Sequence, residues 1–271
     1  MTQAAGTTGT LPRVDAATVA ALAALLLPLL TMWHEIGGHA AACVLLGGKP
    51  TAIGAFYVNC NSPSAVAGVL VALAGVTVNA LLSFAAWCWW RRARGDLPRL
   101  VAWYVWIAEA MVAAGYLGFS GVSGFGDLGT GAGGSLAGLP MPVAIRIAEL
   151  VVGILLYIAI VRAGIRALAT MLGTGATTRP ARRTVAHLFD LVSGISAVLV
   201  GLLNPEGLVI TIMSAMASSF GGLAGFISIG FAQGATDDPR AFVITRRPAL
   251  LLAGPAMLAA FALVLGPTLR F

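Results

Sequence analysis

Residues Thr31 to Gly48 read TMWHEIGGHAAACVLLGG, an apolar run that carries two imidazoles and a carboxylate, at His34, Glu35 and His39. The chain has only three histidines, and two of them fall within these six positions. Ionisable side chains are costly in hydrocarbon, and where they occur inside an apolar span they commonly mark a functional site. The stretch therefore predicts a membrane-spanning segment with a polar site built into it.

The composition of the whole chain is typical of a membrane protein. Of its 271 residues, 59% are hydrophobic and only 10% are charged, and the mean hydropathy is +0.93. Soluble domains carry roughly 25% charged residues. The net charge of +6 comes mostly from arginines in short connections, which favours a lipid bilayer and no nucleic acid as the partner. We expect an integral membrane protein, of the bacterial inner membrane.

Seven apolar runs are long enough to span a bilayer, which takes about 20 residues. They are approximately Ala17–Gly47, Ser64–Trp90, Leu100–Phe119, Val143–Leu172, Val185–Leu203, Gly207–Ala232 and Ala249–Leu265. The expected fold class is all-α: a polytopic transmembrane helical bundle of about seven spans. A short β-like piece, Ala52 to Val58, follows the first span. Eight glycines between Gly121 and Gly138 predict a re-entrant or cavity-lining segment, because lipid cannot satisfy so much irregular backbone.

The basic residues predict an orientation. All of the 16 lysines and arginines except Lys49, Arg146 and Arg270 fall in the N-terminal segment or in and around the connections after the second, fourth and sixth runs. Basic residues in short loops favour the cytoplasmic side. The N-terminus is therefore expected in the cytoplasm, with His34 and His39 in the outer half of the first span. Three cysteines, Cys43, Cys60 and Cys88, lack the paired spacing of a cysteine-type zinc site.

The spacing of the two histidines predicts an irregular helix. Histidines four apart lie on one face of an α-helix, whereas five residues at about 100° each place the rings roughly 140° apart. A widened π-type turn absorbs one extra residue and restores a common face. Gly37 and Gly38 lie between the two histidines, where glycine tolerates the distortion. Neutral imidazoles are good zinc ligands, and Glu35 beside them suits proton transfer from metal-bound water.

Three segments together resemble the site-2-protease-like, M50-type intramembrane zinc metalloproteases. HEIGGHA, from His34 to Ala40, resembles the family's zinc motif, expanded by one residue. LAGVTVNALL, from Leu73 to Leu82, resembles a segment that ends in asparagine, with Val76 in place of a proline. GFGDLG, from Gly124 to Gly129, resembles the downstream aspartate motif, with Leu128 in place of a glycine. Residues 1–142 would form the metalloprotease-like core, and residues 143–271 would add helices of unassigned role within one integrated membrane domain.

The resemblance implies a role for each matching residue. His34, His39 and Asp127 would bind Zn²⁺, Glu35 would be the general base, and Asn79 would contact the substrate strand or the oxyanion. The implied activity is hydrolysis of a peptide bond in a membrane protein by metal-activated water, with a membrane-protein substrate or a partner subunit. The family's site opens toward the cytoplasm, in conflict with the orientation expected from the charges.

Other interpretations of the same residues stay open. The His-Glu-His cluster can hydrogen-bond between helices, Asp127 can cap a glycine-rich turn, and Asn79 can bond a neighbouring helix. A relative that binds metal without proteolysis would act as a scaffold, a chaperone or an accessory subunit of a larger complex. A transporter would use Glu109, Asp127 and the glycine-rich segment as its pathway.

Overall fold

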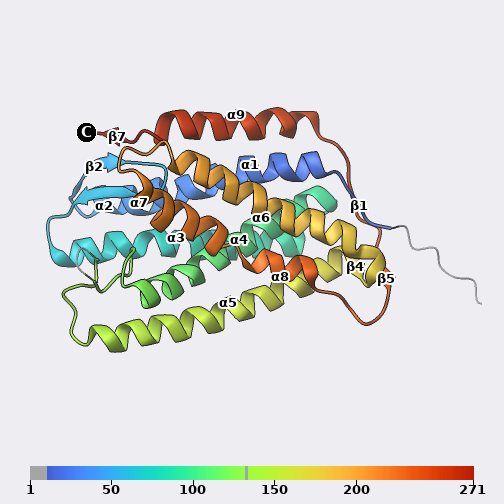
Figure 1. Ribbon diagram of the computed structural model, residues 1–271, viewed down its shortest axis with the longest axis horizontal. Coiled ribbons are helices and arrows are strands. Elements are labelled where there is room, and N and C mark those ends of the chain that lie inside the picture. The colour runs from blue at the N-terminus through green and yellow to red at the C-terminus, as the bar shows by residue number, and fades with distance from the viewer. Residues whose placement is uncertain (1–10, 132–133) are drawn as a thin grey trace, which may run out of the picture.

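The bundle is built from helices that run roughly parallel to one long axis (Figure 1). The structure is a computed structural model that describes residues 11–131 and 134–271. Within those residues seven helical stretches are long and apolar enough to cross a membrane. The first, Ala16–Leu45, consists of α1 (Ala16–Met32), a π-helical segment η1 (Trp33–Ala40) and α2 (Ala41–Leu45). The fold class expected from the sequence is confirmed.

Five of the other six stretches begin and end within four residues of the predicted runs, whereas the fifth span begins earlier, at Ala176 instead of Val185. The six stretches are α3 (Ala65–Arg92), α4 (Asp96–Ser123), α5 (Pro142–Leu172), η2 (Ala176–Thr178) with α6 (Arg179–Gly201), α7 (Leu208–Ile210) with η3 (Thr211–Gly221) and α8 (Gly225–Phe231), and α9 (Pro248–Leu265). Local chemistry sets several starts: the Asp15 carboxylate accepts from Thr18 N–H at 2.8 Å before α1, and the Ser64 hydroxyl accepts from Ala67 N–H at 3.2 Å before α3. Such caps satisfy backbone donors that a helix leaves free.

Short strands lie at both ends of the bundle. At one end β2 (Lys49–Ile53) pairs with both β3 (Val58–Asn61) and β7 (Leu269–Arg270), giving the order β3-β2-β7. At the other end β1 (Arg13–Val14) pairs with β6 (Val243–Ile244), and β4 (Gly173–Thr174) with β5 (Asp238–Pro239). The predicted β-like connection after the first span is present, but its bounds differ: Ala52–Val58 covers the end of β2, the first residue of β3 and the turn between them, where Gly54 N–H bonds to the Tyr57 carbonyl.

An aromatic core joins helices from both halves of the chain. Trp103 and Tyr104 of α4 pack with Phe189 of α6 and Phe226 of α8, and all four are almost fully buried. The rings of Tyr104 and Phe189 stack with centroids 4.0 Å apart, and the Tyr104 hydroxyl donates to the Val185 carbonyl at 2.8 Å. Residues 143–271 therefore pack directly against residues 1–142.

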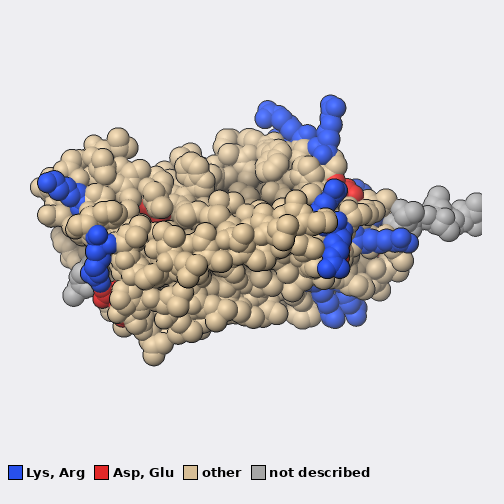
Figure 2. Space-filling view, turned by 90° about the horizontal axis from the view of Figure 1, so that it is seen from above, with Lys and Arg blue, Asp and Glu red and all other residues tan. Residues whose placement is uncertain are grey.

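Charged side chains gather near the two ends and leave the middle bare. On the face seen in Figure 2, most lysine and arginine side chains lie at the end where Figure 1 places β1, β4 and β5, and fewer lie at the opposite end. A broad band between them carries almost none. This distribution suits a bilayer around the middle of the bundle. We call the end with β1, β4, β5 and β6 the basic end, and the end with β2, β3 and β7 the sheet end.

Candidate metal centre

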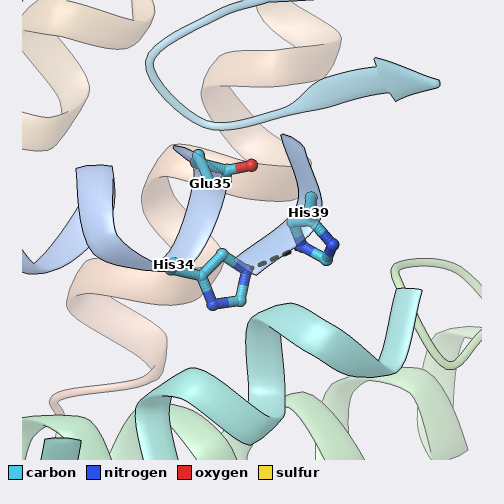
Figure 3. Close-up of side chains that lie close together, drawn as sticks. All are labelled: His34, Glu35 and His39. Atoms are coloured by element: carbon cyan, nitrogen blue, oxygen red, sulfur yellow. Dashed lines mark hydrogen bonds between the residues drawn. The ribbon is translucent and has the colours of Figure 1, made fainter. Parts of the chain in front are cut away.

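The two histidines of the apolar run lie on one face because the helix between them is widened. Residues Trp33–Ala40 form the π-helix η1, inserted between the α-helical turns of α1 and α2. The prediction of an irregular turn is confirmed, and Figure 3 shows the two rings facing each other. Gly38 is needed for packing, since a Cβ there would lie 2.8 Å from the Cα of Gly75 in α3. Neither Gly37 nor Gly38 has a positive φ.

Each imidazole is held by its Nδ1 atom. His34 Nδ1 lies 2.9 Å from the Asn79 amide oxygen, and His39 Nδ1 lies 2.8 Å from the Val71 carbonyl oxygen. Both partners are on α3, and a carbonyl oxygen can only accept, so Nδ1 carries the proton in each ring. In the neutral rings the two Nε2 atoms then present lone pairs. These Nε2 atoms lie 3.1 Å apart.

Asp127 brings a third electron-pair donor to the same point. Its Oδ2 lies 3.2 Å from His39 Nε2 and 3.5 Å from His34 Nε2. It has no hydrogen bond of good geometry among the described residues. Three acceptor atoms facing one another repel unless protons or a metal cation lie between them.

The three distances suit a tetrahedral ion. Zinc binds histidine nitrogen and carboxylate oxygen at about 2.0–2.2 Å, so two ligand atoms of a tetrahedron lie roughly 3.3–3.6 Å apart. The observed separations of 3.1, 3.2 and 3.5 Å are close to that edge length. The residues therefore fit a zinc ion with two nitrogen ligands and one oxygen ligand.

The glycine-rich segment positions Asp127. It leaves α4 through Gly124, which ends the helix with φ 74°, and turns again at Gly126 with φ 87°, both in the left-handed region that favours glycine. The backbone then folds back, with Gly131 N–H donating to the Gly124 carbonyl at 2.9 Å. The segment lines a cavity as predicted, although residues 132 and 133 of the predicted range lie outside the described residues.

Glu35 lies beside the two imidazole rings but makes no hydrogen bond to either of them. Its side chain is buried, and its Oε2 has no hydrogen-bond partner among the described residues. One ligand atom from each of His34, Glu35 and His39 lies within 4.8 Å of the others, so this buried group can hold a metal ion. Asp127 Oδ2 approaches both imidazoles more closely than that limit.

The centre forms one wall of a cavity of about 500 Å³. Glu35, His39 and Asp127 are among the polar residues of its lining. The remaining walls come from the β2–β3 connection, the start of α3, the end of α4 and η3, and include Phe56, Tyr57, Val69, Phe119, Met213 and Ser214. A second cavity of about 60 Å³ lies against Asn79, Glu109 and Ser193 and also touches His34 and Glu35.

Four of the five predicted site residues come together at the centre, and the fifth, Asn79, lies behind one of the rings. His34, Glu35, His39 and Asp127 share the centre, whereas Asn79 is 1% exposed and lies behind the His34 ring, lining the smaller cavity. Glu109 is also buried beside that cavity, and its Oε2 is unpartnered within the described part of the chain.

Sequence reasoning missed several neighbours of the rings. The Tyr116 ring stacks on His34 with centroids 5.0 Å apart and an interplanar angle of 7°. Gly75 lets α3 approach, because a Cβ there would lie 2.7 Å from His34 Cε1 and collide with His39 Nε2. Cys43 and Cys60 form a disulfide that ties the end of the ligand helix to β3. Gly75 lies inside LAGVTVNALL, the segment from Leu73 to Leu82 that resembles the family's asparagine segment. That resemblance was the one indication in the sequence that α3 approaches the rings.

Comparison with known proteins adds no relative. No protein-family model matches the chain, and neither a curated protein nor a solved structure matches it significantly.

Proposed function

We propose that the protein is a zinc-dependent intramembrane peptidase that resembles the site-2-protease-like, M50-type enzymes. The observation that carries the proposal is the convergence of three electron-pair donors, His34 Nε2, His39 Nε2 and Asp127 Oδ2, next to a buried carboxylate in a cavity inside the bundle. Catalytic zinc sites typically use three protein ligands and leave one position for water.

His34, His39 and Asp127 would hold the ion, and Asn79 and the Val71 carbonyl orient the two rings toward it. Hydrogen bonds of this kind fix the tautomer of a ligating imidazole and increase its basicity. The substrate contact that the resemblance implies for Asn79 stays a prediction. When bound, zinc acidifies water and polarises a carbonyl group.

Glu35 is the residue suited to receive the proton. Its carboxylate lines the larger cavity beside His39 and Asp127. No described residue donates a hydrogen bond to its Oε2 atom. A general base must be free to accept and within reach of the attacking water. The same carboxylate would then return the proton to the leaving amine. An extended segment of a membrane protein is the substrate that such a cavity suits.

Metal analysis tests the binding part of the proposal. We expect about one zinc per chain in the purified wild type and none in the double variant His34→Ala, His39→Ala. His187→Ala is the matched control, because that imidazole lies elsewhere, with its Nε2 3.0 Å from the Ile227 carbonyl. Unchanged zinc in the double variant would place the metal site elsewhere.

Glu35→Gln tests the catalytic part. Loss of the proton acceptor should abolish cleavage while zinc content and folding are retained. Membrane-protein fragments in cells producing the wild type or Glu35→Gln can be compared by mass spectrometry of new chain termini. Fragments that persist unchanged in Glu35→Gln would favour the non-proteolytic metal-binding scaffold.

A further inference from the structure

The disulfide marks the compartment that the sheet end faces. Cys43 lies four residues after His39, and Cys60 is on β3, in the lining of the larger cavity. Disulfides persist in oxidising compartments and are rare in the cytosol. The third cysteine, Cys88, is free and lies near the opposite end of α3, beside Arg91 and Arg92. The paired and the free thiols are therefore separated by the length of a span.

The basic residues give a second, independent indication. The loops at the basic end are tied together, since β1 pairs with β6 and β4 with β5, and the Arg240 guanidinium donates to the Thr170 carbonyl at 3.1 Å. At the sheet end Lys49 and Arg270 lie on paired strands, and Arg146 bonds to the Gly121 carbonyl near the end of α4. The excess of basic residues places the basic end in the cytoplasm.

The depth of the centre agrees with both. At about 1.5 Å per residue, His34 lies roughly 27 Å along the helix from Ala16 at the basic end. The hydrocarbon core of a bilayer is about 30 Å thick. The imidazoles therefore lie in the half of the first helical stretch, Ala16–Leu45, that is nearer the sheet end, where the β2–β3 connection lines the cavity.

From these three observations we propose that the metal centre opens to the oxidising, extracytoplasmic side of the membrane. This inference rests on the proposed peptidase function. The substrate class would then be a membrane-protein segment that enters from the outer side of the bilayer, past the strands of the sheet end. The Cys43–Cys60 disulfide holds β3 against the ligand helix at this entrance. This orientation is opposite to the one that the family resemblance implies.

Thiol labelling in intact cells tests the orientation without any assay of activity. Glu206→Cys and Arg94→Cys place one exposed cysteine at the sheet end and one at the basic end. Both are made in a Cys88→Ser background that keeps the disulfide. An impermeant maleimide should label position 206 and leave position 94 unlabelled until the cells are permeabilised. Labelling at 94 with protection at 206 would overturn the proposal.

The state of the disulfide is measured in the same cells. After acid quenching, Cys43 and Cys60 should resist alkylation until a reductant is added, whereas Cys88 of the wild type reacts once the protein is denatured. Alkylation of Cys43 and Cys60 without reductant would overturn the assignment of an oxidising side.

Zinc content of the same preparations separates this inference from the proposed function. If the protein contains zinc but position 94 is labelled in intact cells, the proposed metal site is retained and its orientation is the reverse of the one proposed. Label at 206 with no zinc would keep the orientation and remove the peptidase proposal.

Discussion

At the scale of single residues, the imidazole pair depends most directly on a residue without a side chain. Gly75 faces His34 and His39 across the contact between α3 and η1, with no room for a Cβ. Gly68 lies two turns earlier in the same helix, and a Cβ there would lie 4.0 Å from its nearest neighbour, the Ser62 side chain. The two glycines therefore form a matched pair for substitution.

We expect Gly75→Ala to lose most of its zinc, because the added methyl group displaces both ligating rings. Gly68→Ala should retain wild-type zinc, since its methyl group meets only ordinary van der Waals contact. Elemental analysis of both variants, with circular dichroism to verify helix content, checks this. Wild-type zinc in a folded Gly75→Ala protein would contradict the role given to this close approach.

Asn79 provides a second test at this scale. We expect Asn79→Leu to weaken zinc affinity by roughly 10–100-fold, because the His34 ring loses the partner that fixes its tautomer. Asn79→Asp should restore much of the affinity, since a carboxylate oxygen also accepts from Nδ1–H. Competition with a chelator of known affinity measures both. Equal affinities for the wild type and Asn79→Leu would show that the bond does not orient the ligand.

The residues of the His-Glu-His cluster were predictable from sequence, but their supports were not. His34, Glu35 and His39 stand out because ionisable groups are rare in apolar spans. The Val71 carbonyl carries no side-chain indication at all, and its role depends on which part of α3 meets η1. Tyr116 likewise reaches His34 only through the packing of α4.

At the scale of elements, the π-helix η1 is the feature that brings two histidines spaced five residues apart to one face. Deleting Gly38 should convert η1 to regular α-helix and leave the two histidines four residues apart on one face. The helices before and after would keep their rotation, so we expect zinc binding and folding to survive. Zinc content and thermal unfolding of the deletion variant check this. Complete loss of zinc from a folded deletion variant would contradict the interpretation of η1 as an absorbed insertion.

Hydropathy predicted the spans within a few residues because lipid allows little other than continuous helix. The fifth span shows where this reasoning falls short: it was expected from Val185, but α6 begins at Arg179. Arg182 is 1% exposed there and donates to the Gly173 carbonyl, so the helix extends into protein at the basic end. Strand bounds failed for a related reason, since the β2–β3 pairing depends on a turn with no strong sequence pattern.

At the scale of the whole molecule, the centre joins two parts of the bundle. His34 and His39 come from η1, while Asp127 follows α4, and α3 packs against both. A ligand that binds only the folded state stabilises it by about 4 kcal/mol at a thousand times its dissociation constant. We therefore expect added zinc to raise the unfolding temperature of the metal-stripped protein in detergent. The double variant His34→Ala, His39→Ala should show no such rise, and an equal rise in both would place the stabilising ion elsewhere.

The contribution of the second half of the chain was beyond sequence reasoning. Residues 143–271 were expected as spans of unassigned role, yet Met213, Ser214 and Ser218 of η3 line the larger cavity. Which helix neighbours a given face depends on packing among seven similar apolar surfaces, and hydropathy does not distinguish them.

The separation of the ligands along the chain has a consequence for the order of biogenesis. When the first span enters the membrane it presents His34 and His39 alone, and their Nδ1 partners arrive only with α3. Asp127 follows after α4, the third span. A growing chain thus has an incomplete coordination set until nearly half of it has been synthesised. For the proposed zinc site, loading would therefore be a late step in maturation, and early capture of the ion by a nascent chain would be disfavoured.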